Sequence, residues 1–77
     1  MITLDDGTII NDLYEAYIWF REAWIYEPYN IYYEESGKKG TEYYHEYIVV
    51  EPTRDNYNGI SCDIYTLEEF ENFIKNH

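Results

Sequence analysis

The residues of this chain best able to do chemistry are carboxylates, because sixteen acidic residues stand against five basic ones and the formal net charge is −11. Aromatic side chains, including eleven tyrosines and two tryptophans, stand between them. Disordered acidic chains are poor in aromatic residues, since they cannot bury enough apolar surface to offset the entropy of ordering. The charge therefore belongs to a folded domain, and charge of one sign favours solubility or attraction to a basic partner.

Calcium binding is the first chemistry that so many carboxylates suggest. Asn56, Asn58 and Gly59 occupy the third, fifth and sixth positions of a segment that resembles half of an EF-hand loop. The first position is Arg54, whose positive charge repels the metal, and the twelfth is Tyr65, where a bidentate glutamate is needed. An Asn-Gly turn is the expectation, without a bound ion.

Zinc and catalytic chemistry find no support in the sequence. The only cysteine and histidines are Cys62, His45 and His77, which lack zinc-ligand spacing. We expect Cys62 to pack as a small core residue and His45 to lie on a strand surface beside a carboxylate. The chain has no glycine-rich phosphate loop and no nucleophile elbow. The sequence therefore predicts a protein that is not an enzyme and needs no cofactor or metal.

The elements that must position these side chains begin with an amphipathic helix over residues 8–26. Its apolar stripe consists of Ile10, Leu13, Tyr17, Phe20 and Trp24. Asn11 is the predicted N-cap, and Pro28 is expected to end the helix. Asp6 and Gly7 before it could turn a very short hairpin between residues 2–4 and 8–10.

Three strands and a second helix follow. Residues 30–35 and 42–51 are expected to pair around a loop at 36–40, with Pro52 stopping the second strand, and residues 60–65 alternate as a half-buried strand. Residues 67–76 predict a helix, because Thr66 and Glu69 form a capping box and Tyr65 and Phe70 occupy the staple positions. The prediction is one α+β domain over residues 1–77: N-terminal helix, three-stranded antiparallel sheet and C-terminal helix.

Acidic residues and tyrosines are spread over all of these elements. Residues two apart on a strand lie about 6.6 Å apart on one face, and residues three or four apart on a helix about 5–6 Å, so carboxylates can match the separation of successive phosphates. Tyrosine rings accept guanidinium groups by cation–π contact. The carboxylates expected to bind a partner are Glu34, Glu35, Glu42, Glu46, Asp63, Glu68, Glu69 and Glu71, and the expected aromatic anchors are Tyr32, Tyr44 and Trp19. The alternative is a solvated acidic face over a tyrosine-rich core.

In size, acidity, aromatic content and α+β build, the chain resembles the small acidic inhibitors that phages encode against host defence enzymes. These include anti-CRISPR proteins, anti-restriction DNA mimics and uracil-DNA glycosylase inhibitors. The resemblance is one of kind over the whole length, without a diagnostic motif, and it assigns no residue roles. It implies an inhibitor that binds the basic cleft of a CRISPR nuclease or another DNA-handling enzyme.

Partner and location follow from the charge and the apolar pattern. Phosphate binding depends on lysine and arginine, so nucleic acid and anionic lipid are not expected as direct ligands. No apolar run is long enough to span a membrane and no basic signal region opens the chain, so we expect a cytoplasmic protein. The rival hypothesis is a small regulatory or antitoxin-like protein that homodimerises through its aromatic patch.

Overall fold

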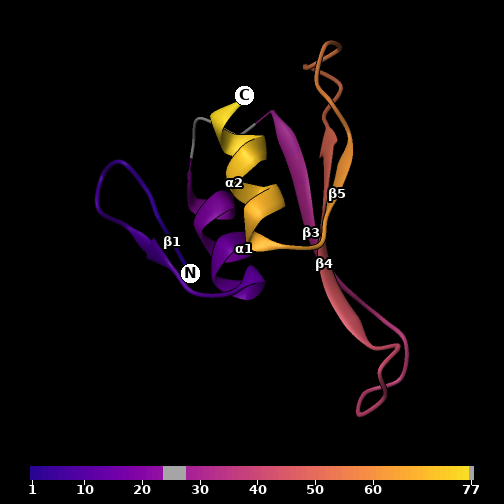
Figure 1. Cartoon of the computed structure of the whole chain (residues 1–77). Helices are drawn as coiled ribbons and strands as arrows, with labels where there is room; N and C mark the ends of the chain where they lie inside the picture. The colour runs from indigo at the N-terminus through magenta and orange to yellow at the C-terminus, as the bar shows by residue number, and fades with distance from the viewer. Residues whose placement is uncertain (24–27, 77) are drawn as a thin grey trace.

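The computed structural model describes residues 1–23 and 28–76 and has two helices, a three-stranded antiparallel sheet and a two-stranded hairpin (Figure 1). The elements in chain order are β1 (Ile2–Thr3), β2 (Ile9–Ile10), α1 (Leu13–Glu22), β3 (Tyr29–Ser36), β4 (His45–Pro52), β5 (Cys62–Ile64) and α2 (Leu67–Lys75). The predicted α+β class is confirmed. The short N-terminal hairpin also forms, with Gly7 at a φ of +90° in its turn.

The main sheet has the strand order β3-β4-β5, so the long strand β4 lies in the middle. Tyr33, Ile48 and Ile64 lie directly opposite one another across the three strands. Ile48 and Val50 of β4 are buried, whereas the odd-numbered residues between and beside them are not. Since alternate residues of a strand point to opposite faces, one face of the sheet is core and the other is not.

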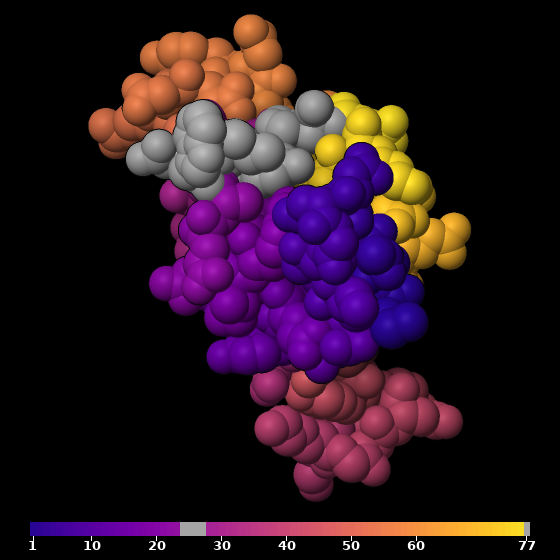
Figure 2. Space-filling view, turned by 90° about the vertical axis from the view of Figure 1, so that its left-hand side faces the viewer, coloured from indigo at the N-terminus to yellow at the C-terminus, as the bar shows by residue number. Residues whose placement is uncertain are grey.

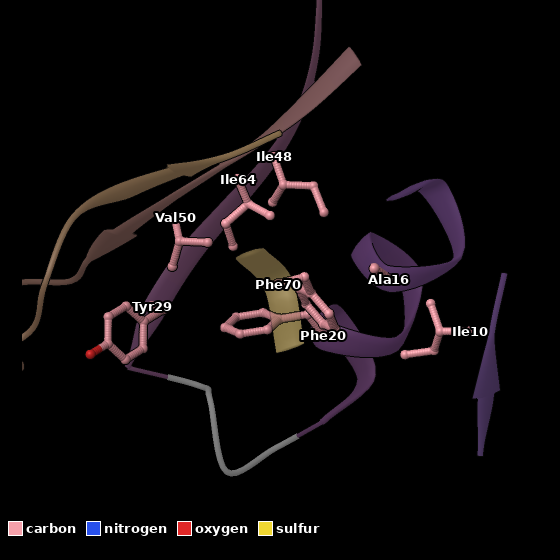
Figure 3. Close-up of a cluster of buried hydrophobic side chains, with 8 residues drawn as sticks. All are labelled: Ile10, Ala16, Phe20, Tyr29, Ile48, Val50, Ile64 and Phe70. Carbon is pink, nitrogen blue, oxygen red and sulfur yellow. The ribbon is translucent and has the colours of Figure 1, made fainter. Parts of the chain in front are cut away.

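Both helices pack on the same face of the sheet, as Figure 1 shows. The buried core draws side chains from β2, both helices and all three main strands (Figure 3): Ile10, Ala16, Phe20, Tyr29, Ile48, Val50, Ile64 and Phe70. Phe70 of α2 lies at the centre, with the ring of Phe20 6.4 Å away and that of Trp19 6.0 Å away between centroids. The core therefore ties α1 to α2 through aromatic contacts as well as to the sheet.

Helix α1 is shorter than predicted. It begins at Leu13, because Asp12 is the N-cap and accepts a hydrogen bond from the backbone N–H of Glu15 at 2.8 Å. The predicted cap, Asn11, is wrong; its backbone N–H instead donates to the side chain of Glu15 at 2.7 Å. The helix ends at Glu22, not at Pro28, with Ala23 as the C-cap. Residues 24–26 of the predicted helix, which include Trp24, lie outside the described residues.

Helix α2 begins at the predicted cap, with the Thr66 half of the capping box formed and the Glu69 side chain bound one residue before the cap. Thr66 is the N-cap, and its hydroxyl accepts a hydrogen bond from the backbone N–H of Glu69 at 3.1 Å. The Glu69 carboxylate in turn accepts from the backbone N–H of Tyr65 at 3.4 Å. The Thr66 hydroxyl satisfies one of the amide groups that a helix start leaves without partners, and the Glu69 side chain holds the residue before the cap.

The loop between β3 and β4 is longer than predicted, because β4 begins at His45 rather than at residue 42. Glu42 and Tyr44 therefore lie in the loop, which holds Gly37 and Gly40 at φ of +86°. Strand β5 likewise begins at Cys62 rather than at residue 60, and Ile60 is 68% exposed. The β3–β4 end and the segment before β5 project from opposite ends of the body (Figure 2).

Candidate binding face

The face of the sheet turned away from the helices is the candidate site, and we call it the open face. Strand alternation and register place ten residues on it: Asn30, Tyr32, Glu34, Ser36, His45, Tyr47, Val49, Glu51, Asp63 and, just beyond β5, Tyr65. No helix of residues 1–23 or 28–76 covers this face (Figure 1). Tyr32 is 44% exposed and Tyr65 47% exposed, although both belong to the folded sheet region.

Three aromatic rings on the open face lie against one another. The rings of Tyr47 and Tyr65 are stacked, with centroids 5.2 Å apart and an interplanar angle of 29°. The ring of His45 lies 5.8 Å from each of them. His45 is exposed on its strand, as the sequence predicted. The contacts hold the three rings in a group that faces away from the helices.

Carboxylates stand beside the tyrosines of this face. The hydroxyl of Tyr32 donates to Glu51 Oε1 at 3.2 Å, and this hydrogen bond to a carboxylate raises the pKa of Tyr32. Partial burial and then the negative charge of Asp63 raise the pKa of Tyr65. Glu34 is directly opposite Tyr47 in the β3–β4 register. Each of the three tyrosines therefore has a carboxylate as a near neighbour.

The open face carries no lysine or arginine among its ten residues. The basic residues of the described chain lie elsewhere: Arg21 on α1, Lys38 and Lys39 in the β3–β4 loop, Arg54 in the loop after β4 and Lys75 on α2. The Lys38-Lys39 pair is exposed at the tip of the hairpin. The electrostatic potential of the open face is consequently set by Glu34, Glu51 and Asp63.

A second acidic group lies at the end of the hairpin, on the side of the sheet that also carries the helices. Glu35 and Glu46 are directly opposite each other there, and the hydroxyl of Tyr44 donates to Glu46 Oε1 at 3.2 Å. Burial and these two carboxylates raise the pKa of Tyr44 to about 12. Burial, with Glu46 as the nearest charge, also raises the pKa of Tyr33. We call these four residues the hairpin-end cluster.

Two of the acidic residues of α2 make contacts within or next to the helix itself. The Glu69 side chain accepts from the backbone N–H of Tyr65, and Glu71 forms an ion pair with Lys75 at 3.6 Å. Glu68 is exposed in the first turn. Trp19, predicted as an anchor, is half-buried and packs edge-on against Phe70. Its ring area therefore contributes to the contact between the helices.

The structure thus divides the predicted site among several places. Tyr32, Glu34 and Asp63 come together on the open face, whereas Glu35, Glu46 and Tyr44 form part of the hairpin-end cluster. Among the tyrosines and carboxylates of the open face, sequence reasoning missed Tyr47, Glu51 and Tyr65. The signal was present for two of them, because Tyr47 and Glu51 stand two residues to either side of Val49 and must share its face.

The described residues offer little support for metal binding or for a reactive thiol. No group of three or more histidine, cysteine, aspartate or glutamate side chains is placed to hold a metal ion within residues 1–23 and 28–76. The Asn-Gly segment forms consecutive turns, with hydrogen bonds from Asn56 N–H to Thr53 O and from Gly59 N–H to Asn56 O. Cys62 is half-buried, and burial raises its thiol pKa, which lowers its reactivity.

Among the described residues, neither helix has the length and apolar character needed to cross a lipid bilayer. Comparison of the chain with protein-family models, with curated proteins and with solved structures finds no match. The open face presents hydrogen-bond acceptors, negative charge and flat ring surfaces.

Proposed function

We propose that this protein is a stoichiometric inhibitor that occupies the basic, nucleic-acid-binding groove of a partner enzyme through its open face. The observation that carries the proposal is the interleaving of Tyr32, Tyr47 and Tyr65 with three carboxylates on a sheet face without lysine or arginine. A CRISPR nuclease or another DNA-handling enzyme is the proposed class of partner. The protein itself supplies no catalytic group.

A groove built for nucleic acid has two kinds of contact to offer. Its lysine and arginine side chains bind phosphates, and its aromatic or arginine planes stack on bases. On the open face each strand carries one carboxylate, Glu34 on β3, Glu51 on β4 and Asp63 on β5, and neighbouring strands lie about 4.8 Å apart. The carboxylates would take the place of phosphates and the tyrosine rings the place of bases.

The rigidity of the face supports the same role. Its side chains stand on three hydrogen-bonded strands whose other side is fixed by the buried core. Tyrosine adds contact area at a small entropic cost, since it has two side-chain torsions to fix. A rigid surface loses little freedom on binding, and more of its interaction energy appears as affinity.

Charge also selects among locations and partners. A surface of this sign is repelled by bare nucleic acid and by anionic lipid, so the proposed ligand is a protein. The proposed place of action is the cytoplasm, where nucleic-acid enzymes of a bacterial host work. Homodimerisation through the open face is disfavoured, because two copies would bring Glu34, Glu51 and Asp63 of each chain together.

The test uses two charge-reversal variants with equal change in net charge. The first replaces Glu34, Glu51 and Asp63 of the open face with lysine. The matched control replaces three exposed acidic residues elsewhere with lysine: Asp5, Glu22 and Asp55. Partners are captured on immobilised wild-type protein from nuclease-treated bacterial lysate and purified, and their binding to labelled DNA and RNA is then measured with each variant added.

One equivalent of wild-type protein or of the control variant should abolish binding of nucleic acid to the partner. The open-face variant should leave that binding unchanged. Simultaneous binding of the protein and nucleic acid to the same partner site would refute the proposal. Full inhibition by the open-face variant would also refute it. Light scattering of the purified protein should give the monomer mass, whereas a stable dimer would favour the regulatory alternative.

A further inference from the structure

We infer that the open face selects arginine rather than lysine on its partner, with Tyr32 and Glu51 forming one guanidinium site and Tyr65 and Asp63 a second. This inference rests on the proposed function for the place of the partner, and it adds the chemical group that the site recognises. Net charge alone would attract lysine and arginine equally, so the choice must come from the arrangement of rings and carboxylates.

The arrangement suits a planar cation. A guanidinium group can lie flat on the exposed face of a tyrosine ring while its N–H groups donate to a carboxylate beside the ring. An ammonium group is a compact, strongly hydrated charge that cannot stack and cannot form the forked pair with both carboxylate oxygens. A ring next to a carboxylate therefore discriminates between the two side chains, whereas a carboxylate alone does not.

Both proposed sites contain such a ring and carboxylate in proximity. Tyr32 and Glu51 are joined by the 3.2 Å hydrogen bond, and about half of the Tyr32 side chain is exposed. Tyr65 is exposed to a similar extent, and the charge of Asp63 is close enough to raise its pKa. Tyr47 stacks on the ring of Tyr65 and fixes its orientation.

Tyr32 of the first site and Asp63 of the second lie on either side of the central strand. Val49 of β4 is directly opposite both Tyr32 on β3 and Asp63 on β5. The sites are therefore about two strand spacings apart, roughly 10 Å, with a half-buried valine between them. An apolar floor at this point excludes water from the approach of two arginine stems, whose methylene groups pack well on apolar surface.

The chain contains an internal example of the contact. The guanidinium carbon of Arg21 lies 5.5 Å from the centroid of the Tyr17 ring on α1. Within residues 1–23 and 28–76 no lysine makes a contact of this kind. The pairing that we infer between chains is thus of a type that this protein already forms within itself.

The probes are fluorescently labelled oligo-arginine and oligo-lysine peptides of equal length, titrated with the protein at fixed ionic strength. Oligo-arginine should bind about fivefold more tightly than oligo-lysine, because a guanidinium group adds flat stacking on the ring and a forked pair with the carboxylate to the attraction that either cation has for the ring. A Tyr32→Leu/Tyr65→Leu variant should lose this preference and keep its affinity for oligo-lysine. The matched control, Tyr43→Leu/Tyr57→Leu, removes two exposed tyrosines of the loops and should keep it.

Equal affinities of the wild-type protein for the two peptides would overturn the inference. So would a preference for arginine that survives in the Tyr32→Leu/Tyr65→Leu variant. Proton NMR of the wild-type protein gives a reading that needs no variant: oligo-arginine should shift the ring signals of Tyr32, Tyr47 and Tyr65 but not that of Tyr57. Shifts of Tyr57 alone would contradict the location.

Failure of arginine selection can be distinguished from failure of the proposed inhibitor function, because the peptide titration contains neither nucleic acid nor a partner enzyme. Arginine preference without displacement of nucleic acid from any captured partner would leave the open face as an arginine-binding surface and remove the inhibitor role. Displacement of nucleic acid with equal affinity for both peptides would keep the inhibitor role and remove arginine selection.

Discussion

Glu35 of β3 and Glu46 of β4 lie directly opposite each other across the antiparallel pair, on the same face of the hairpin. Like charges at directly opposed positions of a sheet are destabilising, because their β-carbons are about 4.5–5.5 Å apart. The hydroxyl of Tyr44 offsets part of this repulsion by donating to Glu46. The hairpin therefore keeps a repulsive pair where opposite charges would stabilise it.

Glu35→Lys should consequently stabilise the protein. The substitution replaces a repulsion by an attraction to Glu46, and a cross-strand pair of this kind contributes about 0.2–1 kcal/mol. The free energy of unfolding in urea should rise by that amount. Glu34→Lys is the matched control, because Glu34 is opposite Tyr47 and faces the other side of the sheet. An equal gain in both variants would mean that lower net charge, not the pair, is responsible.

Thr66→Ala should lower the free energy of unfolding by about 0.5–2 kcal/mol. The substitution removes the hydroxyl that accepts from the backbone N–H of Glu69 at 3.1 Å, and that N–H has no helical carbonyl to bind. Thr66→Ser keeps the oxygen and should stay close to the wild type. Thermal unfolding followed by circular dichroism measures both, and an unchanged melting temperature of Thr66→Ala would contradict the role of the cap.

Local sequence patterns predicted the elements whose signals are local. The α2 start was readable because Thr66 and Glu69 stand at the spacing of a capping box, and the N-terminal hairpin because Gly7 supplies a positive φ. The predicted helix range began five residues before Leu13, and its cap was misplaced by one residue because Asn11 and Asp12 are both good caps. Spacing decides between them: Asp12 is the one that stands three residues before Glu15, whose N–H it accepts.

The division of the acidic residues between faces was not readable in the same way. It depends on the register of β3 against β4, and the predicted loop of five residues was too short. Alternation along β3 separates Glu34 from Glu35 in any register, but only the longer loop places Glu34 opposite Tyr47 and Glu35 opposite Glu46. The candidate site was therefore predicted in kind, as acids among tyrosines, but not as a single surface.

The ionisation of Tyr44 should make stability depend on pH in the alkaline range. Its pKa is raised from 10.0 to about 12 in the folded protein by burial and by the carboxylates of Glu35 and Glu46. A raised pKa stabilises the fold below pH 10, and this contribution is lost as pH rises from 10 to 12. The difference in unfolding free energy between the wild type and Tyr44→Phe should fall over this range. A constant difference would show that Tyr44 does not titrate there.

Affinity for the basic partner should weaken steeply as salt rises. The proposed contacts join exposed opposite charges, which are screened over a Debye length of about 8 Å at physiological ionic strength. Isothermal titration at low and high salt measures the effect, and most of the change should appear in the association rate. An affinity that does not change with salt would remove the electrostatic basis of the proposed function.

Gly37→Ala should destabilise the hairpin by more than about 1 kcal/mol. Gly37 has a φ of +86°, and a β-carbon there would lie 2.7 Å from the carbonyl carbon of Tyr43. Gly40 has the same φ but open space around it, so Gly40→Ala isolates the cost of the backbone conformation. Urea unfolding should rank the wild type above Gly40→Ala and Gly40→Ala above Gly37→Ala. Equal losses in the two variants would mean that crowding at Tyr43 adds nothing.

Because buried and open residues alternate along β4, two sets of residues with different roles share this one strand. Ile48 and Val50 pack in the core, whereas Tyr47, Val49 and Glu51 lie on the open face. Substitutions at the residues of the open face can change the binding surface and leave the buried core intact. A deletion of one residue within β4 would disrupt the fold, because it would turn residues of the open face towards the core. Such a strand can diversify rapidly by substitution and hardly at all by changes in length.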